Sequence, residues 1–457
     1  MKKLLFFTLL LMMLVSACAP SVTPTAAPVP TSRPITPLST QAPAPVKQTE
    51  VTWYVRVNEA EQKWEIETVL PNFQRANPGI KINLVAVPAA DYDRRLQALV
   101  TAGAAPDIWS HWGTNGFQDY VKRGWVADLT PYIESDKFDL SDFLPEVLEI
   151  YKVDGKLMGL PFMSTGSFIF YNIDLFDKTA VKYPTTDWDD KTWTWAAFMD
   201  KCKALTSIKG DPKNDAYGCN LDLQPNEAYA WLWGLDIFPE SAYKTGFADK
   251  SNLADPKISA AYQARQDIIW KNKYMPDPDT TNANSFKDGS IAMNLTTGQG
   301  WLNFSDIKNF KWAVAALPYG GNGRRDVIFT DPWMMSSKTA HMQEAWTFMK
   351  YLASPQIQES WLKLVNTPPV RKSLLEKWAA QYPNMQPEEV KQVFQGALKY
   401  GRETPSHMLV KYDTLNQIIS SALTLVYSDQ VKAAEVIPVS ATALDAALVK
   451  IQNEFKK

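Results

Sequence analysis

The chain has 457 residues, of which 46% are hydrophobic and 21% are charged, and its formal net charge is −2. This length exceeds one ordinary hydrophobic core, so it predicts at least two globular bodies. The near-neutral charge and the lack of a long basic stripe outside the leader speak against nucleic-acid binding. Three cysteines, three histidines and no CxxC or HExxH spacing weigh against a zinc site, so we expect neither a metal nor a cofactor.

Residues 1–17 have the composition of a secretory signal peptide. Lys2 and Lys3 precede the apolar run LLFFTLLLMMLVSA, which is too short for an ordinary membrane-spanning helix. The run ends in Val15-Ser16-Ala17-Cys18, which resembles the bacterial lipoprotein signal. We expect lipidation of Cys18, which would hold the protein at a membrane surface without crossing the membrane. The alternative is a generic signal peptide with an incidental cysteine.

Residues 18–49 are dense in Pro, Thr, Ser and Ala. This composition lacks the apolar content to pack, so it predicts a disordered, partly extended tether. A tether of this kind would let a folded body float near the membrane to which its first residue is attached.

The folded body begins with alternating strand and helix patterns. Strands are predicted at 50–57, 80–87 and from 106, and helices at 58–77 and 91–102. Pro71 is expected to kink the first helix or to start a new turn. The β-α-β-α-β order predicts a parallel sheet with helices on both faces, and ligands bind beyond the carboxyl ends of such strands.

The stretch Tyr151–Asn172 contains two short apolar runs around a small polar middle. Leu157–Met163 and Phe168–Tyr171 are predicted strands, and Ser164–Ser167 allows the backbone to change direction. One interpretation is a bulged strand inside a single domain. The other is a crossover between two lobes, with the polar segment facing a cleft.

Strands and helices also alternate after this stretch, which predicts a second α/β lobe. Strands are expected at 216–221, 291–293, 312–317 and 327–329, and helices at 194–206, 224–235, 258–270, 344–352, 357–364, 388–400, 412–427 and 436–455.

Several short segments, in order along the chain, match one protein family. They are FQRANPGIKI (73–82), AGAAPDI (102–108), GWVADLTPYI (124–133), residues 154–172, TWTWAAF (192–198), FKDGSIAM (286–293), residues 315–318, AWTFMKYLAS (345–354) and NTPPVR (366–371). Together they resemble the extracellular solute-binding proteins of bacterial ABC importers, in the sugar-binding, maltose-binding-protein-like class (solute-binding family 1).

This resemblance implies an α/β, two-lobed periplasmic-binding-protein fold (type II). Each lobe would be a mostly parallel sheet flanked by helices, and three hinge crossovers would join the lobes. Lobe one would comprise 50–162 plus 331–366, and lobe two 166–328 plus 368–457. The implied hinge residues are Met163, Ser164, Thr165, Thr330, Asp331, Asn366 and Thr367.

The resemblance also implies which side chains meet the ligand. Asn, Glu, Thr and Arg would bond sugar hydroxyls, and aromatic faces would cover the C–H side of the sugar. The implied contacts are Asn58, Glu59, His111, Trp112, Asn115, Ser164, Thr165, Tyr229, Trp231, Thr297, Gly298, Trp301, Trp333, Arg371 and Tyr412. His111 could instead be a satisfied loop histidine, and Arg371 could form an ion pair across the lobes.

Cys202 and Cys219 remain after Cys18 is assigned to lipidation. Cysteines left over in an oxidising compartment often pair, so we expect a disulfide between them. Two buried thiols are the alternative.

The predicted function is that of a lipid-anchored, extracytoplasmic receptor that captures a carbohydrate and delivers it to membrane permease subunits of an ABC transporter. It would be a monomer on the cell-surface or periplasmic side and would carry out no catalysis. Two alternatives remain. One is a lipid-anchored glycoside hydrolase, although no motif picks out a carboxylate pair. The other is a receptor of the same fold for a polyamine, iron or a phosphorylated polyol, with Arg56 and Arg371 keeping a phosphate ligand open.

Overall fold

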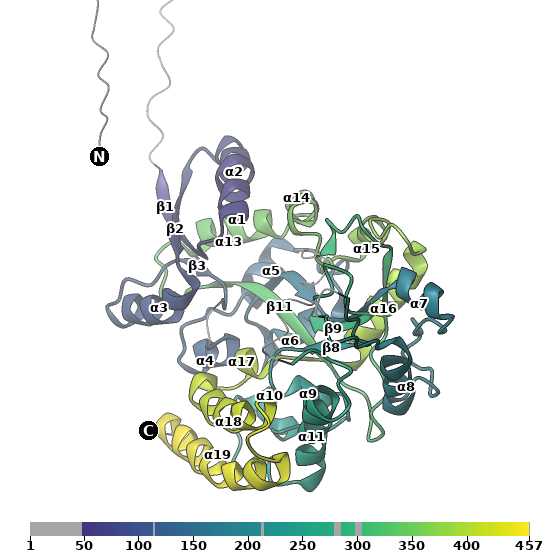
Figure 1. Cartoon of the computed structure of the whole chain (residues 1–457). Helices are drawn as coiled ribbons and strands as arrows, with labels where there is room; N and C mark the ends of the chain where they lie inside the picture. Colours follow the sequence, from purple (N-terminus) through teal and green to yellow (C-terminus); the bar gives the residue numbers. More distant parts are fainter. Residues whose placement is uncertain (1–47, 113–114, 212–213, 278–284, 298–303, 457) are drawn as a thin grey trace, which may run out of the picture. The chain divides into compact units, whose positions relative to one another are not determined.

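A computed structural model describes residues 48–112, 115–211, 214–277, 285–297 and 304–456 (Figure 1). The leader, Cys18 and the predicted tether up to residue 47 lie outside these residues, as do Gly298 and Trp301. Thr49, the last residue of the predicted tether, already belongs to β1. Among the residues described, none of the helices combines the length and the apolar content that crossing a membrane requires.

The first sheet follows the order β12-β11-β3-β1-β2, and β6 also pairs with β11. Its strands are β1 (Thr49–Arg56), β2 (Ile80–Val87), β3 (Ile108–Trp109), β6 (Leu160–Thr165), β11 (Asp326–Met335) and β12 (Gly401–Glu403). β1 runs parallel to both β2 and β3, as the β-α-β-α-β pattern predicts. β11 is antiparallel to β3 and β6, so the complete sheet is mixed.

The second sheet follows the order β10-β7-β9-β8. Its strands are β7 (Ser167–Asn172), β8 (Asn220–Asp222), β9 (Met293–Thr297) and β10 (Trp312–Ala315). β7 is antiparallel to β10 and β9, and only the β8–β9 pair in this sheet is parallel. The α/β class is confirmed. The expectation of a mostly parallel sheet fails for this second sheet, because β7 pairs with strands distant in sequence that run in the opposite direction. A separate hairpin joins β4 (Lys152–Val153) and β5 (Lys156–Leu157).

Helices flank the sheets, and the last two, α18 and α19, pack side by side and against α11 (Figure 1). Their bounds are α1 (Glu59–Trp64), α2 (Leu70–Ala76), α3 (Tyr92–Thr101), α4 (Phe117–Lys122), α5 (Thr130–Asp136), α6 (Pro145–Ile150), α7 (Ile173–Thr179), α8 (Trp195–Leu205), α9 (Ala228–Trp231), α10 (Glu240–Thr245), α11 (Pro256–Trp270), α13 (Met342–Leu352), α14 (Pro355–Val365), α15 (Leu375–Ala379), α16 (Pro387–Tyr400), α17 (Pro405–Met408), α18 (Tyr412–Tyr427) and α19 (Ala433–Phe455).

The helix predicted over 58–77 is interrupted by one π-helical turn, Glu65–Val69, between α1 and α2. Pro71, at the second position of α2 directly after the π turn, has no backbone N–H, so it removes one hydrogen bond from an otherwise continuous helix. Asn58 caps α1 by accepting a hydrogen bond from the Glu61 backbone N–H. Glu65, the first residue of the π turn, lies four residues after the buried Glu61 and is itself buried.

The first predicted crossover lies where β6 ends and β7 begins. Gly166 separates the two strands, and a Cβ there would lie 2.7 Å from the Cβ of Ala397 and 3.0 Å from Oδ2 of Asp326. Asp326 Oδ2 accepts a hydrogen bond from the Ser167 backbone N–H. Glycine is therefore needed because neighbouring atoms approach the backbone closely, and the chain passes here from one sheet to the other.

The second predicted crossover is the middle of β11, not the end of a short strand. β11 passes through Thr330 and Asp331 and pairs first with β12, then with β6 and finally with β3. Its register shifts between Asp331 and Pro332, which fits a proline that cannot donate to the ladder. The strand predicted at 327–329 is thus the first part of a ten-residue strand.

The predicted disulfide is not formed, and this expectation is wrong. Cys202 on α8 and Cys219 before β8 are both free, buried thiols. Burial, together with the neighbouring Cys219, raises the pKa of Cys202 well above its ordinary value. The two residues therefore follow the alternative, in which neutral cysteines act as small core side chains.

Candidate functional site

A polar groove of about 670 Å³ runs along one face of α18. Among the described residues, its walls carry hydroxyl and amide groups, one carboxylate and no lysine or arginine. The lining residues are Ser406, Tyr412, Asp413, Thr414, Asn416, Gln417, Ser420, Ser421 and Thr424. Such a surface offers many neutral donors and acceptors and little net charge.

The amphipathic pattern of α18 explains why these side chains share a face. Leu415, Ile419, Leu423 and Val426 recur at helical spacing and are buried in the core. The residues between them therefore turn outward along the groove. Asp413 stands in the first helical turn, where a carboxylate also complements the helix dipole.

The segment before α9 supports the floor of this groove. Asn226 donates hydrogen bonds through its side chain to Ser420 Oγ (2.9 Å) and to Asn416 Oδ1 (3.4 Å). The Tyr412 hydroxyl donates to the buried Glu227 carboxyl, at 3.0 and 2.9 Å from its two oxygens. Burial raises the pKa of Glu227 to about 7. These bonds fix the rotamers of Tyr412 and Asn416, as a preorganised binding surface requires.

The segment that leads into α4 lies beside the N-terminal end of α18. Asn115 Oδ1 accepts a hydrogen bond from the Asp413 backbone N–H at 3.4 Å, and Asp119 Oδ1 accepts one from the Lys411 backbone N–H at 3.2 Å. A Cβ at Gly116 would lie 2.6 Å from the Cα of His407, so glycine allows α4 to approach α17. The chain segments that carry β3 and α18 therefore meet at this point.

Two histidines stack beneath this contact. The rings of His111 and His407 are 3.6 Å apart, with an angle of 19° between their planes. His111 Nε2–H donates to the Thr330 carbonyl at 2.6 Å, and His407 Nδ1 lies 2.7 Å from Glu403 Oε1. Asp331 lies 3.3 Å from His111 Nε2 and accepts a hydrogen bond from Trp112 Nε1 at 3.0 Å.

His111, Asp331 and His407 bring three metal-ligating atoms within 4.8 Å of one another. An imidazole nitrogen binds a metal in the plane of its ring, at about 2.1 Å. Two nearly parallel rings 3.6 Å apart share no point that satisfies this geometry for both. The arrangement is a hydrogen-bonded polar core between β3, β11 and α17, not a preformed metal centre.

Burial sets the protonation of this core. It lowers the pKa of His111, and it lowers the pKa of His407 to about 4. It raises the pKa of Glu403 to about 8. Burial alone would raise the pKa of Asp331 as well, but the His111 contact and the charge of Arg56 bring it below its usual value. Near neutral pH both imidazoles are uncharged, which is what allows them to stack.

The structure brings some of the predicted ligand contacts together. Tyr412 lines the groove, and Asn115 accepts a hydrogen bond from the backbone N–H of Asp413, another lining residue. Trp112 and His111 belong to the adjoining polar core. Ser164 and Thr165 are fully buried, Asn58 and Glu59 are exposed at the start of α1, and Thr297 is half-buried at the end of β9.

Four predicted contacts are corrected. Tyr229 and Trp231 belong to the core, and the Tyr229 hydroxyl donates to the Leu221 carbonyl at 2.9 Å. Trp333 packs on the rings of Trp53, Phe162 and Trp112. Arg371 is buried, donates to the Ala353 carbonyl and pairs with Asp142 at 2.9 Å. Core packing and ion pairing use these side chains, so none of them lines the groove.

Sequence reasoning missed Asp413, Asn416, Gln417, Ser420 and Asn226. The first four recur every three or four residues along the predicted helix 412–427. A polar stripe at this spacing, beside an apolar one, is a signal that could have located the groove. Asn226 offered no such signal, because only the folded chain brings it to α18.

Comparison with known proteins identifies the family. The sequence profile of the bacterial extracellular solute-binding proteins matches residues 69–387. The chain belongs to this family. It is therefore the substrate-binding component of an ABC importer, a receptor without catalytic activity that works outside the cytoplasm.

The following relatives are each less than 30% identical to this chain in sequence. A Brucella abortus protein named only as a binding protein is 29% identical, over 65% of this chain and 69% of its own. The multiple sugar-binding protein of Streptococcus mutans is 23% identical, over 72% of this chain and 77% of its own. The Listeria monocytogenes ABC substrate-binding protein solved with cycloalternan has a TM-score of 0.71 and 24% identity, covering 88% of this chain and 99% of its own. This last likeness shows the fold.

Proposed function

We propose that this solute-binding protein captures a carbohydrate, either a monosaccharide or an oligosaccharide, and delivers it to the permease of its importer. The observation that carries the proposal is the neutral, hydroxyl- and amide-lined groove along α18. Sugar hydroxyls act as both donors and acceptors, so they match Asn, Gln, Ser and Thr side chains. The names of the Streptococcus mutans relative and of the cycloalternan complex point to the same class of ligand.

The charges of the site favour a sugar over the charged alternatives. A polyamine would need several carboxylates, and the groove contributes one, Asp413. A phosphorylated polyol would need a free cation at the groove. Arg56 is held by Glu61, at 2.6 and 2.9 Å, and lies over the ring of Trp112. Arg371 is committed to Asp142. Neither Arg56 nor Arg371 is therefore free to bind a phosphate group at the groove.

Recognition is proposed to work by closure of two lobes, one around each sheet. A ligand that touches both lobes favours the closed state by its higher affinity for it. The predicted crossover at 163–165 is supported by the junction of β6 and β7, where the chain passes from one sheet to the other. Residues 330–331 lie inside β11, a strand of the first sheet that the chain enters after leaving β10 of the second sheet. Leu144 N–H donates to the Val370 carbonyl, and Lys372 N–H to the Asp142 carbonyl. These bonds tie 370–372 to lobe one, so we place the third crossover after Ser373, beyond the predicted 366–368.

A panel of ligands tests the proposed function. We expect the melting temperature of the purified mature protein to rise with one series of sugars, and not with polyamines or glycerol phosphates. A ligand that binds only the folded state stabilises it by about 2.7 kcal/mol at a hundredfold excess over its dissociation constant. The sugar should be recovered unaltered by mass spectrometry. A rise only with a charged ligand would overturn the carbohydrate proposal while leaving the family intact.

The lipid anchor is also a proposal, and it rests on the sequence around Cys18, which lies outside the described residues. We expect cells fed an alkyne analogue of palmitate to label the full-length protein, and Cys18→Ser to abolish both labelling and membrane fractionation. Cys202→Ser is the matched control, because that thiol is buried in the folded body. Equal labelling of wild type and Cys18→Ser would contradict the anchor.

A further inference from the structure

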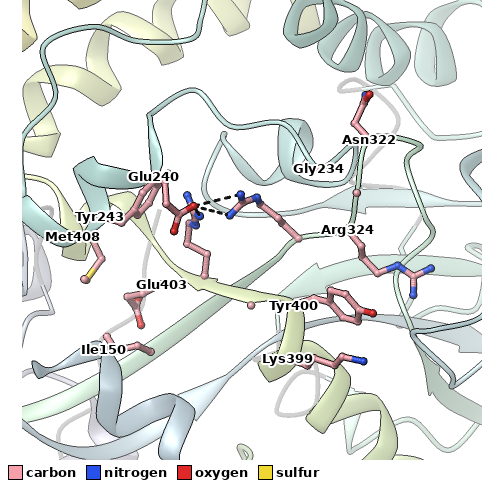
Figure 2. Close-up of a pocket in the computed structure, with 14 residues that line it drawn as sticks. Ile150, Gly234, Glu240, Tyr243, Asn322, Arg324, Lys399, Tyr400, Glu403 and Met408 are labelled. Carbon is pink, nitrogen blue, oxygen red and sulfur yellow. Dashed lines mark hydrogen bonds and ion pairs between the residues drawn. The ribbon is translucent and has the colours of Figure 1, made fainter.

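A second pocket, of about 500 Å³, lies beside β12 and differs from the α18 groove in charge (Figure 2). Four cationic side chains line it, Arg324, Arg325, Lys399 and Arg402, against two carboxyl groups, Glu240 and Glu403. Burial raises the pKa of Glu403 to about 8, which leaves that group largely uncharged at neutral pH. The chain as a whole has a net charge of −2, so this is a local concentration of positive charge.

The acidic groups nearby pair with three of these cations, Arg325, Arg402 and Lys399, and among the described residues Arg324 forms no ion pair. Glu240 accepts from both Arg402 and Arg325, so one carboxylate serves two guanidinium groups. Arg402 is also anchored by Asp236 at 2.7 Å, which fixes its position. Arg325 is the looser partner, because its nitrogens lie 3.4 Å from Glu240 and its side chain is 34% exposed. It is free to exchange this contact for a ligand.

The two remaining cationic side chains that line the pocket are Arg324 and Lys399. The Arg324 guanidinium lies within 5.7–5.9 Å of the rings of Trp188, Tyr319 and Tyr400 and donates to the Trp188 carbonyl. Lys399 pairs with Asp189 at 2.7 Å on the surface. Arg324 adds positive potential, whereas Asp189 offsets the charge of Lys399. Arg325 and Arg402 remain the groups placed to touch a bound molecule.

Glycines make one wall of the pocket. Gly323 has φ +137°, and a Cβ at Gly234 would lie 2.6 Å from the Cα of Gly323. The loop that precedes Arg324 therefore packs directly on the turn after α9, and both glycines line the pocket. Glycine-rich backbone beside arginines is a setting in which proteins bind oxyanions, because no side chain keeps the anion at a distance.

We propose that this pocket binds a small oxyanion, namely a phosphate or sulfate group, with Arg325 and Arg402 as its main contacts. Planar guanidinium groups recognise such oxygens by paired hydrogen bonds. The site is separate from the sugar groove, so it adds to the proposed function and does not depend on it. Ile150, at the end of α6, lines the pocket from the side of the first sheet.

Titration with inorganic phosphate and with sulfate tests this site, at an ionic strength held constant with potassium chloride. We expect a saturable rise in melting temperature for the wild-type mature protein, and binding weakened about tenfold or more in Arg325→Gln. Arg94→Gln is the matched control, because Arg94 is an exposed arginine paired with Asp91 on α3. It should bind phosphate like the wild type.

Three further results decide the interpretation. Binding of glucose 6-phosphate at least tenfold tighter than inorganic phosphate would assign the pocket to a phosphorylated small molecule; equal affinity would assign it to the free ion. An equal response of wild type, Arg94→Gln and Arg325→Gln, or the same rise in chloride alone, would overturn the proposal. A sugar-dependent shift that survives in Arg325→Gln would show that the variant is folded and that the two sites are separate.

Discussion

Glu65→Gln is expected to stabilise the protein much more at pH 8 than at pH 5, with a difference on the order of 3 kcal/mol between the two pH values. Glu65 is 2% exposed, and its Oε2 has no hydrogen-bond partner. The nearest cation, Arg56, is held by Glu61. Burial therefore raises the pKa of Glu65 to about 8, and the charge of Glu61 adds to the shift.

The direction follows from proton linkage. Below the pKa of the unfolded chain, about 4.5, Glu65 is protonated in both states and resembles glutamine. Between pH 4.5 and 8 the unfolded chain releases this proton while the folded protein retains it, so rising pH costs stability. Glutamine does not titrate in either state, so the Glu65→Gln variant does not lose folding stability in this way as the pH rises. Urea unfolding followed by tryptophan fluorescence at pH 5, 6.5 and 8 measures the difference between variant and wild type.

Glu67→Gln is the matched control for this experiment. Glu67 lies in the same π-helical turn, and its side chain is exposed. The control should reproduce the wild-type pH profile, including the slope that Glu227 and Glu403, with their own raised pKa values, contribute. Parallel profiles for Glu65→Gln and wild type would mean that Glu65 is ionised in the folded protein.

Asp413→Asn is expected to lower the affinity for the sugar by about 10- to 100-fold. A hydrogen bond from a ligand hydroxyl to a carboxylate contributes about 1.5–3 kcal/mol, more than one to a neutral amide. Asp413 supplies the carboxylate of the α18 groove, and asparagine keeps its shape. Isothermal titration with the sugar series that raises the melting temperature measures the effect.

Asp413 also stands in the first turn of α18, so its replacement removes a favourable charge at a helix N-terminus. Glu435→Gln makes the same change in the first turn of α19, at an exposed residue that does not line the α18 groove. This control should bind sugar normally. An affinity of Asp413→Asn within twofold of wild type would remove Asp413 from the binding site.

The local sequence pattern predicted the positions of helices and strands better than it predicted which strands pair with one another. The helix at 412–427 was placed with its observed bounds, because its apolar residues recur at helical spacing. The strand at 327–329 was cut short, because Asp331 and Pro332 are typical of a strand end. β11 continues through them since it exchanges one neighbour for another at that point. Whether two paired strands run parallel or antiparallel depends on partners distant in sequence, so neither segment alone could predict it.

The predicted site was biased toward aromatic residues. Trp231 and Trp333 suit a sugar platform in sequence, but packing against rings from other segments buries both of them. Tyr412, a predicted ligand contact, lines the groove, and its hydroxyl donates to Glu227. The polar stripe beside it carries less distinctive residues, and its role became clear only when the folded chain placed Asn226 and Asn115 against it.

The late position of β11 in the chain has a consequence for biogenesis. Ile108 in β3 pairs with Met335, so the first sheet lacks an inner strand until that residue has been synthesised and exported. Until then β3 presents an open edge, the feature by which unfinished sheets aggregate. Pairing across so long a separation also slows folding. A chain arrested before β11 is therefore expected to depend on chaperones that shield strand edges.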